Sequence, residues 1–322
     1  MKLLSEADLH RLLTPAMAID SSERAYIVLS RGQMLVPMRS EIARPDGAGV
    51  VFAMPGYLPG RVFGLKVIAT RGDESTAMVL LFGTESLQPL GLFSADHLTD
   101  YRTGAGIAAA TRLLARPDAR CHVVFGAGRL AGPCARLVAR VRPITRTIIV
   151  GRGTARAEAL AEQLRAEGLA AETCRSADIV AEADVVTTVT TSSVPVFPGR
   201  LLRPGTHVNL GGAFRPDTRE SDDTLARQGF FWCDSLDACL SRSGDLRQPL
   251  DAGVLDRARV VGEIGAALAG DLRGRATAEE ITVFKSLGTA AQDICLAEDV
   301  LNMPGPSGAL EWRPEGQEAP PR

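Results

Sequence analysis

The sequence predicts an α/β protein with two parts, a doubly wound parallel sheet and a smaller α+β domain that precedes it. Three observations support this fold class. An apolar run at 121–125 ends in the glycine turn Gly126-Ala127-Gly128, strands and helices alternate from there onward, and residues 33–92 instead carry short strand-like runs. Alternation of strand with helix is typical of a parallel sheet with helices on both faces.

The first part is expected to begin with helices and continue as a mixed or antiparallel sheet. Ser5 and Thr14-Pro15 resemble helix starts, and apolar residues recur at helical spacing over 15–31. An alanine-rich helix is expected over 102–114. The strand-like runs between these helices, separated by turn signals, are 34–38, 49–54, 61–69, 77–82 and 89–93.

The second part is expected to alternate strands with helices, as in a doubly wound sheet. A long final helix is predicted over 283–303, and the proline- and glycine-rich residues 304–322 are expected to be mobile. The predicted parallel strands are 121–125, 146–150, 171–173, 184–189, 207–210, 229–233 and 260–261.

Composition and charge exclude several classes of protein. The 322 residues include 36 basic and 38 acidic side chains, so there is no basic excess for nucleic acid. No apolar run reaches the roughly 18 residues that span a bilayer, and no signal peptide is recognisable. Six scattered cysteines and four histidines lack the spacing of a disulfide framework or a metal site. We therefore expect a cytoplasmic protein that binds a small molecule, without metal, membrane or nucleic acid.

The glycine turn is a candidate dinucleotide site. Gly126 permits a tight turn, Gly128 lets the backbone approach a pyrophosphate, and Ala131 allows close packing of the helix on its strand. Other cofactor contacts are expected at the carboxyl ends of neighbouring strands, where open α/β sheets bind ligands. The full set of candidates here is Gly126, Ala127, Gly128, Arg129, Leu130, Thr188, Val189, Thr190 and Gly211.

The end of the second parallel strand indicates which nicotinamide cofactor is used. It is followed by Gly151-Arg152-Gly153, with no carboxylate before Glu158 to hold a ribose 2′-hydroxyl. Arg152 can instead bind a 2′-phosphate, which favours NADPH over NADH. The alternative is that Arg152 is an ordinary solvated arginine.

Two cations lie at or within apolar strands of the first part. Arg39 follows Val36-Pro37-Met38, and Lys66 lies inside the run 61–69. Because burying an unpaired charge is costly, the pair indicates a site for a small anion, and a carboxylate fits the arginine fork. The alternative is that both side chains point outward from a half-exposed sheet.

Three further segments carry polar groups that suit an anion or a proton. Arg102-Thr103 is expected to open the alanine-rich helix, and Ser286-Leu287 the last one, so that free amides would face a phosphate. Each could equally be a plain cap. His97 and His207 could donate protons, although a lone histidine is more often structural.

In combination, these residues resemble the ornithine cyclodeaminase/mu-crystallin family over roughly residues 4–303. The resemblance rests on seven segments: Val36–Arg39, Met54-Pro55, Gly64–Lys66, Leu98–Thr103, Gly126–Gly128, Gly212–Glu220 and Thr282–Gly288. It implies a homodimer in which a Rossmann domain, residues 116–284, is inserted into a substrate-binding and dimerisation domain formed by 1–115 and 285–322.

The resemblance also implies roles for individual residues. Arg39 and Lys66 would grip the substrate carboxylate as the catalytic pair. Arg102 and Thr103, with the glycine turn, would hold the pyrophosphate. The substrate pocket is expected to contain Arg39, Met54, Lys66, Phe214 and Ser286, with Ser286 and Leu287 also near the cofactor.

One departure from the family pattern bears on the reaction. Cyclodeaminases and related alanine dehydrogenases carry an aspartate two residues before the proline of the Gly-x-x-x-Pro loop, but here that position is Phe214. Phe214 cannot act as a general base. The continuation Arg215-Pro216-Asp217-x-Arg219-Glu220 instead resembles the ketimine reductases of the family. The resemblance therefore implies an NADPH-dependent reductase of cyclic ketimines such as Δ1-pyrroline-2-carboxylate. The alternatives are an open-chain amino- or imino-acid dehydrogenase, an ornithine cyclodeaminase, and a crystallin-like protein that binds NADPH or another ligand without turnover.

Overall fold

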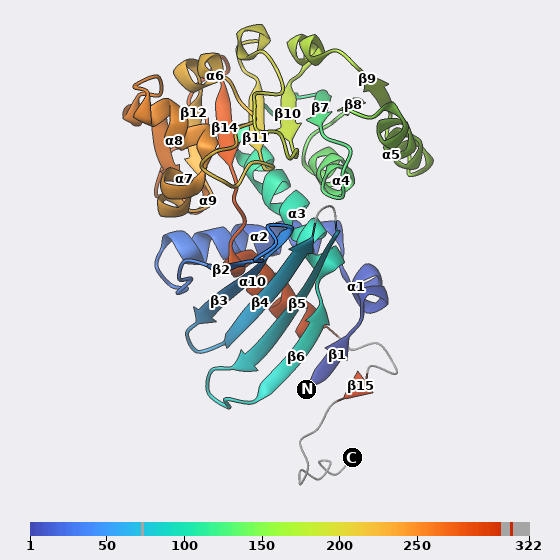
Figure 1. Ribbon diagram of the computed structural model, residues 1–322, viewed down its shortest axis with the longest axis vertical. Helices are drawn as coiled ribbons and strands as arrows, with labels where there is room; N and C mark the ends of the chain where they lie inside the picture. Colours follow the sequence, from blue (N-terminus) through green and yellow to red (C-terminus); the bar gives the residue numbers. More distant parts are fainter. Residues whose placement is uncertain (72–73, 304–309, 312–322) are drawn as a thin grey trace.

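The computed structural model describes residues 1–71, 74–303 and 310–311, which form two sheets joined by helices (Figure 1). The first sheet is mixed and has the order β15-β1-β6-β5-β4-β3-β2. Its strands are β1 (Lys2–Leu4), β2 (Ser40–Ala43), β3 (Gly49–Leu58), β4 (Val62–Arg71), β5 (Glu74–Gly83), β6 (Pro89–Ser94) and β15 (Leu310–Glu311). Of residues 304–322, the structure describes only Leu310–Glu311. The expectation that this tail is mobile therefore falls mainly on residues outside the described ones.

The second sheet is parallel throughout and confirms the predicted α/β class. Its order is β13-β12-β14-β11-β10-β7-β8-β9, so the chain reverses direction across the sheet between β7 and β10. Its strands are β7 (Cys121–Phe125), β8 (Arg146–Val150), β9 (Ala171–Cys174), β10 (Val185–Thr188), β11 (His207–Leu210), β12 (Phe230–Cys233), β13 (Val260–Glu263) and β14 (Thr282–Lys285).

Helices cover both sheets and connect them. The predicted caps at Ser5 and Thr14 are confirmed, because each side chain accepts an amide hydrogen bond from the first turn. The α-helices are α1 (Glu6–Leu12), α2 (Pro15–Ser30), α3 (Asp96–Leu114), α4 (Ala131–Val141), α5 (Thr154–Ala166), α6 (Asp223–Gln228), α7 (Leu236–Arg242), α8 (Gly244–Asp251), α9 (Ile264–Leu268) and α10 (Ala290–Leu301). Short 3₁₀ turns occupy Ala177–Glu182, Gly199–Leu201 and Arg257–Arg259.

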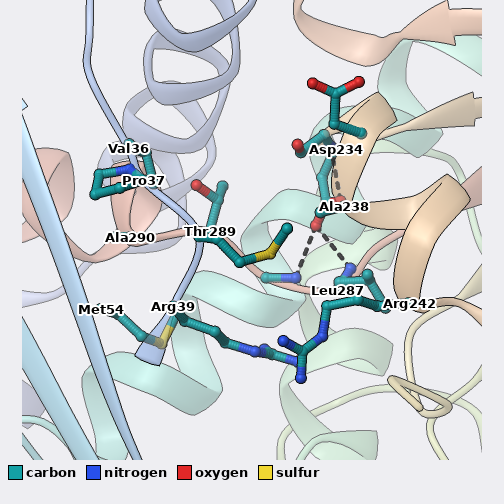
Figure 2. Close-up of a pocket in the computed structure, with 14 residues that line it drawn as sticks. Val36, Pro37, Arg39, Met54, Asp234, Ala238, Arg242, Leu287, Thr289 and Ala290 are labelled. Carbon is teal, nitrogen blue, oxygen red and sulfur yellow. Dashed lines mark hydrogen bonds between the residues drawn. The ribbon is translucent and has the colours of Figure 1, made fainter. Parts of the chain in front are cut away.

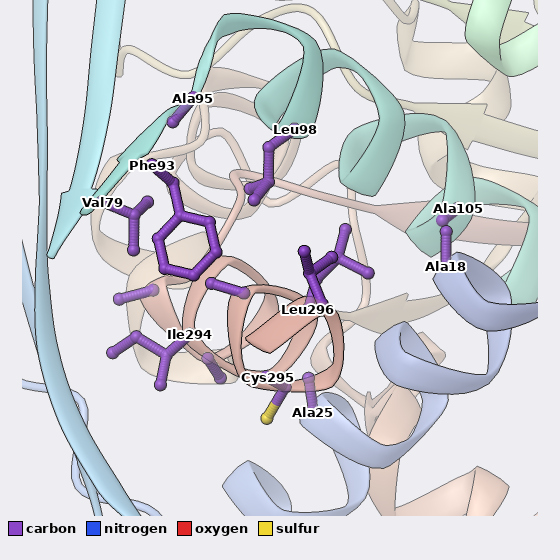
Figure 3. Close-up of a cluster of buried hydrophobic side chains, with 14 of the residues drawn as sticks. Ala18, Ala25, Val79, Phe93, Ala95, Leu98, Ala105, Ile294, Cys295 and Leu296 are labelled. Atoms are coloured by element: carbon purple, nitrogen blue, oxygen red, sulfur yellow. The ribbon is translucent and has the colours of Figure 1, made fainter. Parts of the chain in front are cut away.

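The core of the first part lies between its sheet and α10. Phe93 on β6 and Val79 on β5 face Ile294 and Leu296 of α10, and Leu98 of α3 closes the cluster (Figure 3). All five side chains are buried. The last helix therefore returns from the parallel sheet to pack on the first sheet, although the two are far apart in sequence.

Three predicted elements are wrong in part. Residues 34–38 form no strand beyond a single bridge from Leu35 to Tyr57, because Pro37 has no amide hydrogen to extend a ladder; the strand is β2 instead. The predicted helix 283–303 begins as β14, which pairs with β11 and β12 inside the parallel sheet. The helix follows only at Ala290, after Gly288 at φ +76°.

The third correction concerns α3. It begins at Asp96, so Arg102 and Thr103 lie inside the helix rather than at its start. Thr103 donates its hydroxyl hydrogen to the Thr99 carbonyl at 2.7 Å, within the helix. The amides at this point are used by the helix itself and are not free for a phosphate.

Candidate active site

The glycine turn lies at the carboxyl edge of the parallel sheet, where the strand order reverses. Gly126 has φ +120°, and a Cβ there would lie 2.6 Å from the carbonyl oxygen of Val189. A Cβ on Gly128 would meet no described atom within 4 Å. Leu130 stands at the N-cap of α4 and cannot accept a hydrogen bond from the first amides of that helix. This cradle of open backbone and helix amides fits a pyrophosphate.

A buried carboxylate orders the loops beside this turn. Glu220 is fully buried and accepts hydrogen bonds from the amides of Thr190 at 2.7 Å, Gly212 at 2.8 Å and Ala213 at 3.0 Å. The Gly211 amide donates to the Thr188 carbonyl at 2.9 Å. The predicted cofactor segments 188–190 and 211 are thus brought together next to Gly126. Glu220 holds these segments in place, although sequence reasoning gave it no role.

A buried ion pair supports the same loop. Lys285, at the end of β14, donates to the Ala213 carbonyl at 2.6 Å and to Asp245 at 2.8 Å. Asp245 in turn accepts from the amides of Glu220 and Ser221 at 2.8 and 3.0 Å. This network fixes the backbone immediately before Phe214.

The arginines near the turn have different partners from one another. Arg129 forms a two-pronged ion pair with Asp100 of α3, at 2.9 and 3.0 Å, so its side chain joins the two parts of the protein. Arg152 is exposed, and no side chain pairs with it in the described part of the chain. Close by, Arg175 after β9 donates to the hydroxyl of Thr154, the first residue of α5, at 3.0 Å.

Lys66 lies on the covered face of the first sheet. It pairs across the strands with Met54, so the two side chains share one face of the sheet. Lys66 is 1% exposed, and its Nζ lies 2.8 Å from Oδ1 of Asp293 on α10. Burial lowers the pKa of Lys66 to about 8, although the Asp293 carboxylate opposes this effect.

Arg102 shares the same carboxylate. Its Nε donates to Asp293 Oδ1 at 3.0 Å, and its backbone carbonyl accepts from Gln292. A Cβ on Gly288 would lie 2.6 Å from Arg102 Nη1, so the guanidinium packs against the segment before α10. Arg102, which was predicted to bind the pyrophosphate, is therefore linked to Lys66 through their shared partner Asp293. Sequence reasoning missed Asp293.

Arg39 faces a cavity of about 220 Å³ between the two parts of the protein (Figure 2). Its guanidinium carbon lies 4.8 Å from the centre of the Phe52 ring and 5.6 Å from that of Phe214, and the two rings meet edge to face. Arg39 Nη2 is buried and has no hydrogen-bond partner among residues 1–71, 74–303 and 310–311. The other cavity-lining residues are Val36, Pro37, Met38, Met54, Asp234, Ser235, Asp237, Ala238, Arg242, Leu287, Gly288, Thr289 and Ala290.

Asp234 organises the back wall of this cavity (Figure 2). Its Oδ2 accepts from Ser286 Oγ at 3.0 Å and from the amides of Leu287 and Gly288, each at 2.7 Å. The expectation that these amides are free for an anion is therefore wrong, because Asp234 already occupies them. The helix that they were expected to open is capped by Thr289 instead.

His97 and His207, the two candidate proton donors among the histidines, have structural surroundings. His207 is fully buried between Thr282 and Asn209, and burial lowers its pKa to about 3. His97 stacks on His10 at 3.6 Å, and burial lowers its pKa to about 4. Both are neutral near pH 7.

The described residues contain neither a candidate metal site nor a candidate membrane-spanning helix. No group of three or more His, Cys, Asp or Glu side chains in these residues could hold a metal ion. Among the helices in the described ranges, none is long and apolar enough to cross a bilayer.

Comparison with known proteins gives consistent matches over nearly the full length. The model of the ornithine cyclodeaminase/mu-crystallin family matches residues 1–303. A Delta(1)-pyrroline-2-carboxylate reductase of Bacillus cereus is 30% identical over 309 residues, which cover 92% of this chain and 95% of the relative.

Solved structures are similar in fold as well. The Delta(1)-pyrroline-2-carboxylate reductase of Thermococcus litoralis, in complex with NADH and L-proline, has a TM-score of 0.90 at 32% identity and covers 94% of this chain and 96% of that one. An archaeal alanine dehydrogenase dimer with bound NAD has a TM-score of 0.86 at 26% identity, with 94% and 95% covered.

Proposed function

This chain belongs to the ornithine cyclodeaminase/mu-crystallin family, whose enzymes depend on NAD(P), and we propose that it reduces a cyclic ketimine carboxylate. The substrates would be Δ1-pyrroline-2-carboxylate, giving L-proline, and Δ1-piperideine-2-carboxylate, giving L-pipecolate. One observation carries the proposal. Arg39 lines a small cavity and has a buried N–H that is unpaired within the described residues. The loop beside Arg39 carries Phe214 instead of a carboxylate.

The residues of the cavity suit a substrate with one carboxylate and an apolar ring. Arg39 is oriented by the faces of Phe52 and Phe214 and can donate to a carboxylate oxygen. Phe214 has no group that could accept a proton from a second amine, which disfavours ornithine cyclodeamination. Met54 adds an apolar wall beside Arg39.

The chemistry asks for little beyond orientation and a nearby proton. When bound, the nicotinamide supplies a hydride for the imine carbon. Fixing the acceptor against the donor contributes roughly 7–11 kcal/mol in favourable intramolecular cases. Lys66 holds a proton at Nζ, and its lowered pKa of about 8 lets it release that proton near neutral pH more readily than an ordinary lysine. We assign Lys66 this role, with Arg102 and Asp293 as its positioning residues.

We also propose NADPH as the preferred cofactor. Arg152 follows β8 with its guanidinium exposed, and Arg175 lies against Thr154 at the start of α5. Two arginines that follow the neighbouring strands β8 and β9 suit a 2′-phosphate, whereas a carboxylate would suit a ribose hydroxyl. Two of the solved relatives bind NADH or NAD, so the ratio of the KM values for NADPH and NADH tests this preference.

The direct test is an assay of imines with both nicotinamides. Cyclic ketimines should support oxidation of NADPH, whereas pyruvate with ammonia should support little. Arg39→Ala should raise the KM for the imine at least tenfold and leave NADPH affinity unchanged. The control is Arg44→Ala, which removes an exposed arginine of the same region whose ion-pair partner in the described residues is Asp46. Equal loss of imine and cofactor binding in Arg39→Ala would contradict the role of Arg39.

A second candidate is an open-chain amino-acid dehydrogenase, favoured by the likeness to the archaeal alanine dehydrogenase. It predicts turnover with pyruvate and ammonia and none with cyclic imines. A protein that only binds ligands would instead hold NADPH without oxidising it in the presence of any imine. The same panel of substrates separates all three outcomes.

We further propose that the protein is a homodimer formed through the open face of its first sheet. α10 covers the other face and lies behind the strands in Figure 1. On the open face, Phe63 stacks between Tyr57 and Phe82, and Val67 and Met78 are 38% and 48% exposed. Such a face suits a second copy of the chain. Light scattering should give twice the chain mass, and Met78→Lys should give monomers; a monomeric wild type would refute the dimer.

A further inference from the structure

Arg242 lies beside Arg39 in the cavity, although it comes from the other part of the protein. It is the last residue of α7, which follows β12 of the parallel sheet, whereas Arg39 directly precedes β2 of the first sheet. Figure 2 shows the two side chains converging, with their guanidinium ends next to each other. Both residues line the same cavity of about 220 Å³.

Each of the two arginines has an unused donor. Arg242 Nη2 donates to Oε2 of Glu41 at 2.6 Å, but its Nε is buried without a hydrogen-bond partner in the described ranges. Arg39 Nη2 is likewise buried and has no hydrogen-bond partner in these ranges. A buried guanidinium N–H that stays unpaired costs free energy, so two of them at one cavity indicate a ligand that accepts from both.

Charge around the cavity is divided between the two arginines and nearby carboxylates. Burial and the charge of Arg242 lower the pKa of Arg39, whereas Glu41 and Asp234 raise it, and Asp237 also lines the cavity. Glu41 is the carboxylate that Arg242 contacts, and Asp234 is occupied by Ser286 and two amides. One carboxylate bound between the arginines would offset their repulsion and accept both free hydrogens.

We propose that Arg39 Nη2 and Arg242 Nε together bind the carboxylate of the substrate, so that Arg242 is a substrate-binding residue. The inference rests on the proposed function only in taking the substrate to be a carboxylate. Lys66 is assigned the proton rather than this contact, because its ammonium is already paired with Asp293 at 2.8 Å. Since Arg39 precedes β2 and Arg242 ends α7, the bound carboxylate spans the boundary between the two parts of the protein.

The main experiment compares Arg242→Ala with Glu41→Gln in steady-state kinetics on Δ1-pyrroline-2-carboxylate. Loss of a hydrogen bond to a charged group predicts a rise of about 10- to 100-fold in the KM for the imine in Arg242→Ala, at unchanged KM for NADPH. Arg242→Lys should recover only part of this, because an ammonium lacks the fork geometry. Glu41→Gln should change the KM less than about threefold, since Arg242 stays in place.

The Glu41 variant separates binding from a structural role. If Arg242 serves only to join the two parts of the protein through Glu41, the two variants should have the same effect, and that result would overturn the inference. An unchanged KM in Arg242→Ala with normal thermal stability would overturn it as well.

A binding measurement makes the inference independent of the reaction. Calorimetric titration of the NADP⁺-loaded protein with L-proline, L-pipecolate and L-alanine, each against its carboxamide, should show a preference for the acid that is lost in Arg39→Ala and in Arg242→Ala. If cyclic imines are not turned over but this preference is found, the proposed function fails and the two-arginine site stands. If no acid binds better than its amide, the inference is wrong.

Discussion

Replacing Asp293 with asparagine tests the buried charges on which the proposed proton donor depends. Asp293 Oδ1 lies 2.8 Å from Lys66 Nζ and 3.0 Å from Arg102 Nε. Over 2.8 Å, two unit charges interact by about 1.5 kcal/mol in a water-like medium and by about 6 kcal/mol at an effective dielectric constant of ~20. Since one pH unit corresponds to about 1.4 kcal/mol, loss of the carboxylate should lower the pKa of Lys66 by at least about one unit.

The assay is the pH profile of kcat for imine reduction at saturating NADPH. Lys66 is charged below its pKa, so the rate of the wild type should fall as the pH rises through about 8. In Asp293→Asn this fall should move to lower pH by about one unit or more. The direction is fixed, because removing a negative neighbour makes the ammonium easier to deprotonate.

The same helix provides a matched control. Glu298 of α10 is also buried and also pairs with two arginines, Arg24 and Arg61, so Glu298→Gln removes a comparable carboxylate. That variant should lower thermal stability without moving the pH profile. An unmoved profile in Asp293→Asn, with NADPH affinity and melting temperature near those of the wild type, would refute the assignment of Lys66 as the proton donor.

Three other variants test the cofactor site and the loop network. Gly126→Ala should lower NADPH affinity at least tenfold in a calorimetric titration, because φ is +120° and the new Cβ would lie 2.6 Å from the Val189 carbonyl oxygen; unchanged affinity would contradict this. Lys285→Met should cost about 3–5 kcal/mol in urea unfolding, because it leaves Asp245 buried without its cation, and a cost below about 1 kcal/mol would argue against the pair. Arg152→Asp should raise the KM for NADPH at least tenfold relative to NADH, and an unchanged ratio would mean that the 2′-phosphate is held elsewhere.

Local sequence was sufficient for the features that depend on neighbouring residues. The turn from β7 into α4 was predictable because Gly126, Gly128 and Ala131 each meet a steric need within one short segment. The alternation of strands and helices was predictable for the same reason. The error over 283–303 arose because a short apolar run fits either a buried strand or a helix, and only pairing with β11 and β12 decides between them.

The partners of the charged residues were not predictable, because they come from distant parts of the chain. A lysine inside an apolar strand indicates that a counter-charge exists. Nothing local selects Asp293, 227 residues away, from the 38 acidic residues of the chain. Arg242 was missed for a similar reason, since its position at the end of a helix resembles that of any solvated arginine until the fold places it beside Arg39.

The segment between β14 and α10 connects these distant partners. Asp234 binds the amides of Leu287 and Gly288 at one end of the segment, and Asp293 pairs with Lys66 one turn inside the helix that follows. Because Thr289 caps that helix, a shift of the segment at Asp234 would be passed along α10 to the carboxylate beside Lys66. The same segment lines the cavity that Arg39 faces. The position of the proposed proton donor relative to the carboxylate-binding arginine therefore depends on a contact between the segments that follow β12 and β14, although both cations belong to the first part of the protein.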